Sequence, residues 1–170
     1  KAKYSQFIYK LIKYFNYKNM LELGTSLGIT TAYLAIANNK AQVNTVEGCP
    51  EISKIAAKTF KQLDLDNIRL VNDQFDKYLN DLNKNEAFDL IYIDGNHRKE
   101  PTIRYFQQLL NHVHKQSVMI FDDIYWSKEM KQAWKLIKQH PEVIVSIDLF
   151  KMGMIFFNSD LTRQDYVIKY

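Results

Sequence analysis

The sequence has little cysteine, proline or glycine, and it has no long apolar run. One cysteine, Cys49, excludes an internal disulfide framework and fits a reducing compartment, so we expect a cytoplasmic protein. No apolar stretch approaches the roughly 20 residues that span a bilayer, and no signal peptide is visible, although the chain begins at Lys1 and an upstream segment can be missing. The 170 residues, 46% of them hydrophobic, indicate one domain with a single core.

The sequence also lacks a broad basic face. The net charge is +4, but five lysines precede the first acidic residue, Glu22, and the remaining chain is nearly neutral. A nearly neutral body argues against a nucleic-acid partner. Residues 1–18 predict an amphipathic helix, which we expect to pack on the domain or on a second copy in a homodimer rather than on a membrane. Its apolar stripe comprises Phe7, Ile8, Leu11, Ile12 and Phe15.

Strands and helices alternate in residues 19–170, which we interpret as a single domain. The expected strands are 19–23, 41–47, 68–71, 88–94, 117–122, 143–149 and 152–158, with helices at 29–38, 51–63, 75–82, 101–113 and 128–139. The early strands are apolar throughout, as when helices cover both faces of a sheet. The last two strands have no helix between them and must form a hairpin. The pattern predicts an α/β fold, a Rossmann-like doubly wound sheet of seven strands, mostly parallel, with an antiparallel hairpin at the C-terminal edge.

The segment "MLELGTSLGITTAYLA" (20–35) predicts a strand, a loop and a helix. Gly24 permits a sharp turn, and Gly28 lets the helix pack close to the sheet. A dinucleotide-binding loop needs a middle glycine so that pyrophosphate can approach, and Ser26 holds that place. Glu22 puts a carboxylate before the loop, which repels phosphate and suits a cationic ligand.

Two further acids lie where later strands end. Glu47 follows the second strand, where an acidic side chain can accept both hydroxyls of a ribose. Asp73, after the third strand, can accept from an adenine amino group. A ribose ligand without pyrophosphate and with a cationic amino-acid tail describes S-adenosylmethionine. We expect its methionine end to be bound by the first strand end and its loop, at Glu22, Gly24, Ser26 and Gly28.

Four stretches together resemble a known family: "LELGTSLGITTAYLA", "VNTVEG", "FDLIYIDGNH" and "VMIFDDIYW". They are similar to class I S-adenosylmethionine-dependent methyltransferases, and within them to the small O-methyltransferases of the catechol and caffeoyl-CoA type. The resemblance spans residues 19–158 and includes the E-x-G-x-x-x-G loop. It implies methyl transfer from S-adenosylmethionine to a hydroxyl of a small-molecule acceptor, and it implies seven strands.

Three carboxylates are expected at neighbouring strand ends: Asp94, Asp122 and Asp123. Like charges this close need a shared cation or proton. Oxygen ligands favour Mg²⁺, Ca²⁺ or Mn²⁺. In the metal-dependent relatives an Asp-Asn pair ends the fifth strand, so the resemblance implies a divalent ion here. The Asp at position 123 leaves water-mediated hydrogen bonding to the cofactor or the substrate as the alternative, with Asp94 as a cofactor-binding residue.

His97 lies three positions after Asp94, where the relatives carry a lysine that takes the acceptor's proton. A histidine can act as that base, with Asp94 as a second catalytic group, or it is a surface residue. Trp126 falls where the caffeoyl-CoA-type relatives carry a tryptophan, so it either walls the acceptor pocket or packs in the core or a lid. We interpret His112 as a surface residue and Trp134 as core.

Three other functions are alternatives on the sequence alone. A nicotinamide-dependent oxidoreductase shares the topology but needs a GxGxxG loop. An amino-group nucleic-acid methyltransferase often carries an Asn/Asp-Pro-Pro-Tyr/Phe motif where this chain has "DGNH" (94–97). A non-catalytic domain that binds S-adenosylmethionine is the third.

Overall fold

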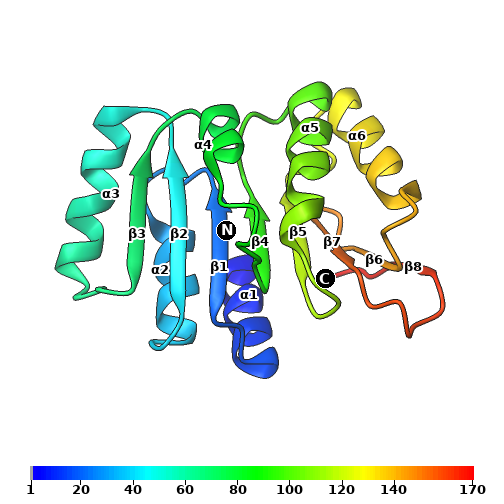
Figure 1. The fold of residues 1–170 in the computed structure, drawn as a ribbon, viewed down its shortest axis with the longest axis horizontal. Helices are drawn as coiled ribbons and strands as arrows, with labels where there is room; N and C mark the ends of the chain where they lie inside the picture. Colours follow the sequence, from blue (N-terminus) through cyan, green and yellow to red (C-terminus); the bar gives the residue numbers. More distant parts are fainter. Residues whose placement is uncertain (1) are drawn as a thin grey trace. The chain divides into compact units, whose positions relative to one another are not determined.

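The computed structural model describes residues 2–170. The chain forms two compact units that divide between Asn80 and Asp81. Figure 1 labels the helices and strands of the chain. Within the described residues, no helix is both long and apolar enough to cross a membrane.

The first unit holds three parallel strands in the order β3–β2–β1. They are β1 (Asn19–Leu23), β2 (Gln42–Glu47) and β3 (Ile68–Asn72), and the helices are α1 (Ala2–Phe15), α2 (Ile29–Ala37), α3 (Pro50–Gln62) and α4 (Phe75–Asp81). The register pairs Leu23 with Val46, and Glu47 with Asn72. The loop after β1 and the residues after β2 and β3 therefore leave the strands at the same edge.

The α1 helix packs on α2, and Ile8 and Ile12 of its apolar stripe are buried. In Figure 1 α2 runs behind β2. The expected packing of this helix on its own domain is therefore found. The physical reason is that apolar side chains of α1 leave water when they pack against α2. The homodimer stays a prediction.

The second unit holds five strands in the order β4–β5–β7–β6–β8. They are β4 (Leu90–Ile93), β5 (Val118–Asp122), β6 (Val145–Asp148), β7 (Met152–Phe156) and β8 (Gln164–Val167), with helices α5 (Lys99–Leu109) and α6 (Lys128–Gln139) and a short 3₁₀ turn, η1 (Leu110–His112). The β4–β5 pair is parallel and fully buried, as its unbroken apolar sequence predicts. The α5 and α6 helices pack against each other.

The α/β fold, the mostly parallel strands and the antiparallel β6–β7 hairpin are as predicted. The strand count is wrong by one, because the described chain has eight strands. The eighth, β8, is exposed at all four positions and pairs parallel to β6, so β6 is not an edge strand. Its sequence therefore carries no burial pattern. Backbone bonds such as Gln164 N–H to the Ile144 carbonyl (3.0 Å) attach it instead.

Candidate functional site

The loop after β1 is held in a conformation that few side chains allow. Gly24, Ser26 and Gly28 have φ values of 108°, 49° and 80°. A Cβ on Gly28 would lie 2.5 Å from Phe60 Cε1 of α3, so this position needs glycine both for its backbone and for close packing. The Gly28 N–H closes the loop on the Thr25 carbonyl at 2.9 Å. The loop therefore turns sharply from β1 into α2, as the sequence predicts.

Glu22 is fully buried beneath this loop. Its Oε2 accepts hydrogen bonds from Thr31 Oγ1 of α2 at 2.5 Å and from Thr45 Oγ1 of β2 at 2.6 Å. The carboxylate therefore ties β1, β2 and the start of α2 together. Its expected contact with a cationic ligand stays a prediction. The two threonines were missed in the sequence, because nothing local marks a side chain that pairs with a residue 9 or 23 positions away.

Glu47 and the loop come together as predicted. Glu47 Oε2 accepts from the Ser26 backbone N–H at 2.9 Å, and Oε1 accepts from the Cys49 N–H at 2.9 Å. The carboxylate is therefore half-buried and fixed, with one oxygen on the loop and the other at the start of α3. Carboxylate oxygens have further lone pairs, so both can still accept from a ligand.

Asp73 lies beside the backbone of Glu47, to whose carbonyl its N–H donates at 3.2 Å. Its side chain caps its own loop through the Gln74 N–H and accepts from Lys77 Nζ at 2.6 Å. The hydrogen bond from Lys77 lowers the pKa of Asp73. Asn72, which the sequence did not mark, also braces Glu47 by donating to its carbonyl at 2.6 Å.

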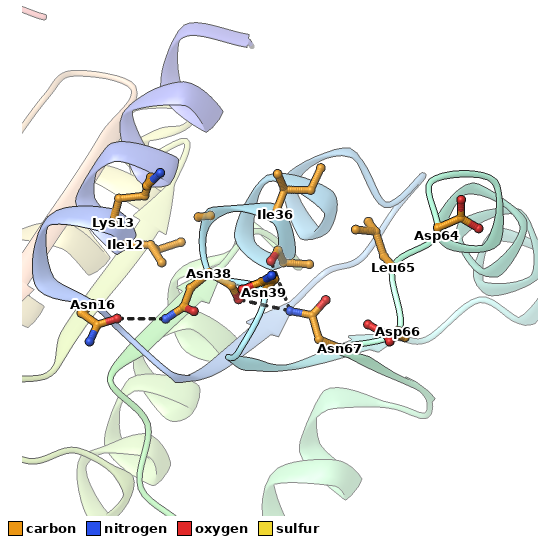
Figure 2. A pocket seen from close by; sticks show the side chains of 12 residues that line it. Ile12, Lys13, Asn16, Ile36, Asn38, Asn39, Asp64, Leu65, Asp66 and Asn67 are labelled. Atoms are coloured by element: carbon orange, nitrogen blue, oxygen red, sulfur yellow. Dashed lines mark hydrogen bonds between the residues drawn. The ribbon is translucent and has the colours of Figure 1, made fainter.

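A pocket of about 560 Å³ lies at the other edge of the first unit (Figure 2). It is lined by residues that precede the strands, among them Asn16, Asn38 and Asn67. Asn67 Nδ2 donates to the carbonyls of Ala35, Asn38 and Ala41, and Asn38 Nδ2 donates to Asn16 Oδ1. Ligands of such sheets bind at the carboxyl ends of strands, and this pocket lies at the opposite edge.

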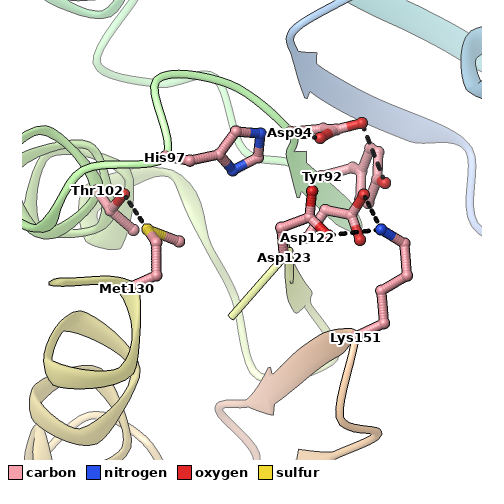
Figure 3. Close-up of polar contacts among 8 residues, drawn as sticks. All are labelled: Tyr92, Asp94, His97, Thr102, Asp122, Asp123, Met130 and Lys151. Atoms are coloured by element: carbon pink, nitrogen blue, oxygen red, sulfur yellow. Dashed lines mark hydrogen bonds and ion pairs between the residues drawn. The ribbon is translucent and has the colours of Figure 1, made fainter. Parts of the chain in front are cut away.

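The second unit brings four predicted side chains together (Figure 3). Asp94 and His97 follow β4, Asp122 ends β5, and Asp123 follows it. His97 Nε2 lies 3.5 Å from Asp94 Oδ1. Single donor atoms of Asp94, His97 and Asp123 lie within 4.8 Å of one another, a group from which Asp122 is absent.

Adjacent acids in this cluster have different surroundings. Asp123 has φ 53°, which turns the chain so that Asp122 is buried while the Asp123 side chain is 24% exposed. Burial, reinforced by the charge of Asp94, raises the pKa of Asp122 to about 6. Asp122 Oδ1 is buried without a hydrogen-bond partner among the described residues. The hydrogen bond to Asp94 raises the pKa of His97.

Lys151, from the turn between β6 and β7, enters the cluster and was not predicted. Its Nζ lies 2.5 Å from Asp123 Oδ1 and 3.7 Å from Asp122 Oδ2. Desolvation lowers the pKa of Lys151, but the hydrogen bond to Asp123 and the neighbouring charges outweigh it and the pKa is raised. Two of the three carboxylates expected to hold a divalent ion therefore already face an ammonium. This arrangement does not fit a resident metal ion.

Trp126, Trp134 and His112, three residues interpreted from the sequence, differ in exposure. Trp126 is 73% exposed, and its backbone N–H donates to the Asp123 carbonyl at 2.9 Å, so its ring lies in solvent near the cluster. Trp134 is buried, as predicted. His112 is buried rather than on the surface, because Nδ1 bonds the Glu86 carbonyl at 2.7 Å. That interpretation was wrong, since helix-end position alone does not show burial.

The fold is shared with several solved methyltransferases. The O-methyltransferase from Bacillus cereus in complex with S-adenosylhomocysteine (SAH) has a TM-score of 0.80 and 21% identity, over 92% of this chain and 81% of that one. The O-methyltransferase of tomaymycin synthesis from Streptomyces achromogenes, in complex with S-adenosylmethionine, has a TM-score of 0.82 and 16% identity, over 94% and 81%. The SAH-bound Podospora anserina methyltransferase has a TM-score of 0.79 and 16% identity, over 90% and 77%.

Sequence comparison adds the family. No curated protein matches the sequence. The profile of a methyltransferase domain matches residues 21–124, which is more than half of the chain and includes the β1 loop, Glu47 and the acids after β4 and β5. The chain therefore belongs to the methyltransferase-domain family.

Proposed function

We propose that the protein is an S-adenosylmethionine-dependent methyltransferase that acts on a hydroxyl of a small molecule, with residues 19–170 as its catalytic domain. One observation supports the assignment of S-adenosylmethionine as the cofactor. The Glu47 carboxylate stands at the end of β2 and holds the Ser26 N–H of the glycine loop at 2.9 Å. A fixed carboxylate beside such a loop suits a ribose diol. The solved structures from Bacillus cereus and Streptomyces achromogenes, which hold SAH and S-adenosylmethionine, support the same assignment.

The residues of the first unit fit the remainder of the cofactor. Gly28 caps α2 without a side-chain hydrogen bond, so the helix start favours the carboxylate of a methionine tail. The loop Gly24–Gly28 has no lysine or arginine, which agrees with a ligand that lacks pyrophosphate. Ser26 lies exposed on this loop, and Asp73 is the candidate for the adenine amino group.

The residues of the second unit supply the acid–base chemistry. S-adenosylmethionine, when bound, supplies a methyl group on a positively charged sulfur. A hydroxyl acceptor must lose its proton, and His97 can take it at a ring nitrogen. Asp94, 3.5 Å from His97 Nε2, then stabilises the imidazolium charge. The exposed Trp126 ring offers an apolar surface to the acceptor.

Isothermal titration with SAH tests the cofactor site. We expect wild type to bind SAH, and Glu47→Gln to bind it ~10–100-fold more weakly, because a charged acceptor of hydrogen bonds is lost. Glu142→Gln, at an exposed glutamate of the second unit, is the matched control and should bind as wild type does. Unchanged affinity in Glu47→Gln would refute the ribose assignment. No binding by folded wild type would refute the proposed function.

A further inference from the structure

Lys151 is set into the acidic cluster of the second unit by a short, well-fixed turn. The Lys151 N–H donates to the Leu149 carbonyl at 2.8 Å, and its carbonyl accepts from the Ile124 N–H at 3.2 Å. Phe150 has φ 66°, a left-handed conformation that a phenylalanine rarely adopts, and its N–H donates to Asp148 Oδ1 at 2.9 Å. The backbone of Lys151 is thus attached both within the turn and to the segment that follows Asp123.

Asp148 holds this turn from its buried side. It is 1% exposed, and its Oδ2 accepts from Tyr125 Oη at 2.6 Å and from Trp134 Nε1 at 3.0 Å. These two donors come from the segment after β5 and from α6. Asp148, at the end of β6, therefore joins these two parts of the unit to the turn that presents Lys151, and this supports a fixed rather than a mobile lysine.

The side chain of Lys151 points at the carboxylates in Figure 3, and it is 28% exposed. Its Nζ is at hydrogen-bond distance from Asp123 Oδ1, one of the three residues whose donor atoms could otherwise surround an ion. An ammonium and a divalent cation repel each other and compete for the same oxygens. The ammonium already supplies one positive charge beside three nearby carboxylates, two of which it faces.

We propose that the Lys151 ammonium takes the place of a divalent cation in this cluster, so that the protein binds no metal ion there and its methyl transfer is metal-independent. The catalytic half of this inference rests on the proposed function. Lys151 is a positioning residue, because it acts through Asp122 and Asp123 and holds both carboxylates in fixed places.

Binding of Mn²⁺, followed by electron paramagnetic resonance, tests the proposal on the intact chain. Wild type should bind no Mn²⁺ at millimolar concentration. Lys151→Met keeps the length of the side chain and removes its charge, so it should bind Mn²⁺ with an affinity at least ~tenfold above the upper limit set by wild type. Lys151→Arg keeps the charge and should behave as wild type does. Lys115→Met removes an exposed ion pair with Asp160 and is the matched control.

Two outcomes would overturn the proposal: wild type binds Mn²⁺ as tightly as Lys151→Met does, or neither protein binds it. The wild-type measurement alone is decisive if Lys151→Met fails to fold, because Mn²⁺ bound by wild type and displaced by Mg²⁺ contradicts metal independence. SAH titration distinguishes a failure of the proposed function from a failure of the proposed role of Lys151. Loss of SAH binding by wild type refutes the proposed function and leaves the Mn²⁺ result standing, since that result needs no cofactor.

Discussion

Removing the charge of Asp122 should stabilise the protein above neutral pH. The Asp122 side chain is only 8% exposed, and its burial raises the pKa from 3.8 to about 6. A pKa raised by about two means that the ionised carboxyl costs the folded state ~3 kcal/mol, since a pKa difference of one is worth about 1.36 kcal/mol. Asp122→Asn keeps the shape but still buries a polar amide, so we expect a gain of ~1–3 kcal/mol in the free energy of unfolding at about pH 8.

The pH dependence gives the sign of this effect. Because the folded-state pKa of Asp122 lies above its unfolded value, the penalty is absent below pH 3.8, where the carboxyl is protonated in both states. It grows as pH rises and is complete above about 6. Denaturant unfolding of Asp122→Asn and wild type across this range should show a difference that vanishes in acid. Asp160→Asn, at an exposed carboxylate, is the control. A variant less stable than wild type at about pH 8, or a difference independent of pH, would refute the reasoning.

Two further substitutions test the packing of the loop after β1 and the hydrogen bonds that hold the turn between β6 and β7. Gly28→Ala should lower the free energy of unfolding by ~2–4 kcal/mol, since the alanine would be strained at positive φ and would press on Phe60; Gly48→Ala, beside a flexible side chain, should cost much less in the same denaturant titration. Asp148→Asn should return the pKa of Tyr125 from about 12 towards 10.0, because the hydrogen bond to Asp148 is its main cause. Spectrophotometric titration measures the pKa of Tyr125. In wild type the raised pKa of Tyr125 stabilises the folded protein below pH 10.0, and this stabilisation is lost by about pH 12; it should be smaller in Asp148→Asn. A Tyr125 pKa that is the same in Asp148→Asn as in wild type would show that the hydrogen bond to Asp148 is not the cause.

What the sequence predicted well depends on residues that are near in the chain or at strand ends. The β1 strand was placed at its observed bounds, because its apolar run ends at a glycine. Glu47 was expected beside the loop, because parallel strands in register end together. The proximity of Asp94 and His97 could be predicted from their spacing of three positions in the sequence. In each case a local pattern determines the position.

What escaped prediction depends on contacts between distant residues. Thr31 and Thr45 look like ordinary helix and strand residues until both are found on the buried Glu22 carboxylate. Lys151 follows Asp123 by 28 positions, and only the β6–β7 turn brings the two together. The β8 strand is exposed at all four positions, so no burial pattern in its sequence encodes its pairing with β6.

The second acid of the Asp122-Asp123 pair and Lys151 are best understood as one feature. An asparagine at position 123 would offer the ammonium a neutral oxygen, and the buried Asp122, 3.7 Å away, would be the main counter-charge. With aspartate there, Lys151 has a charged partner at 2.5 Å on the more exposed side of the pair. Asp123 and Lys151 therefore stabilise each other. The additional negative charge of Asp123 is balanced by the ammonium, and the ammonium pairs with a carboxylate that is partly exposed, which avoids the cost of burying both charges.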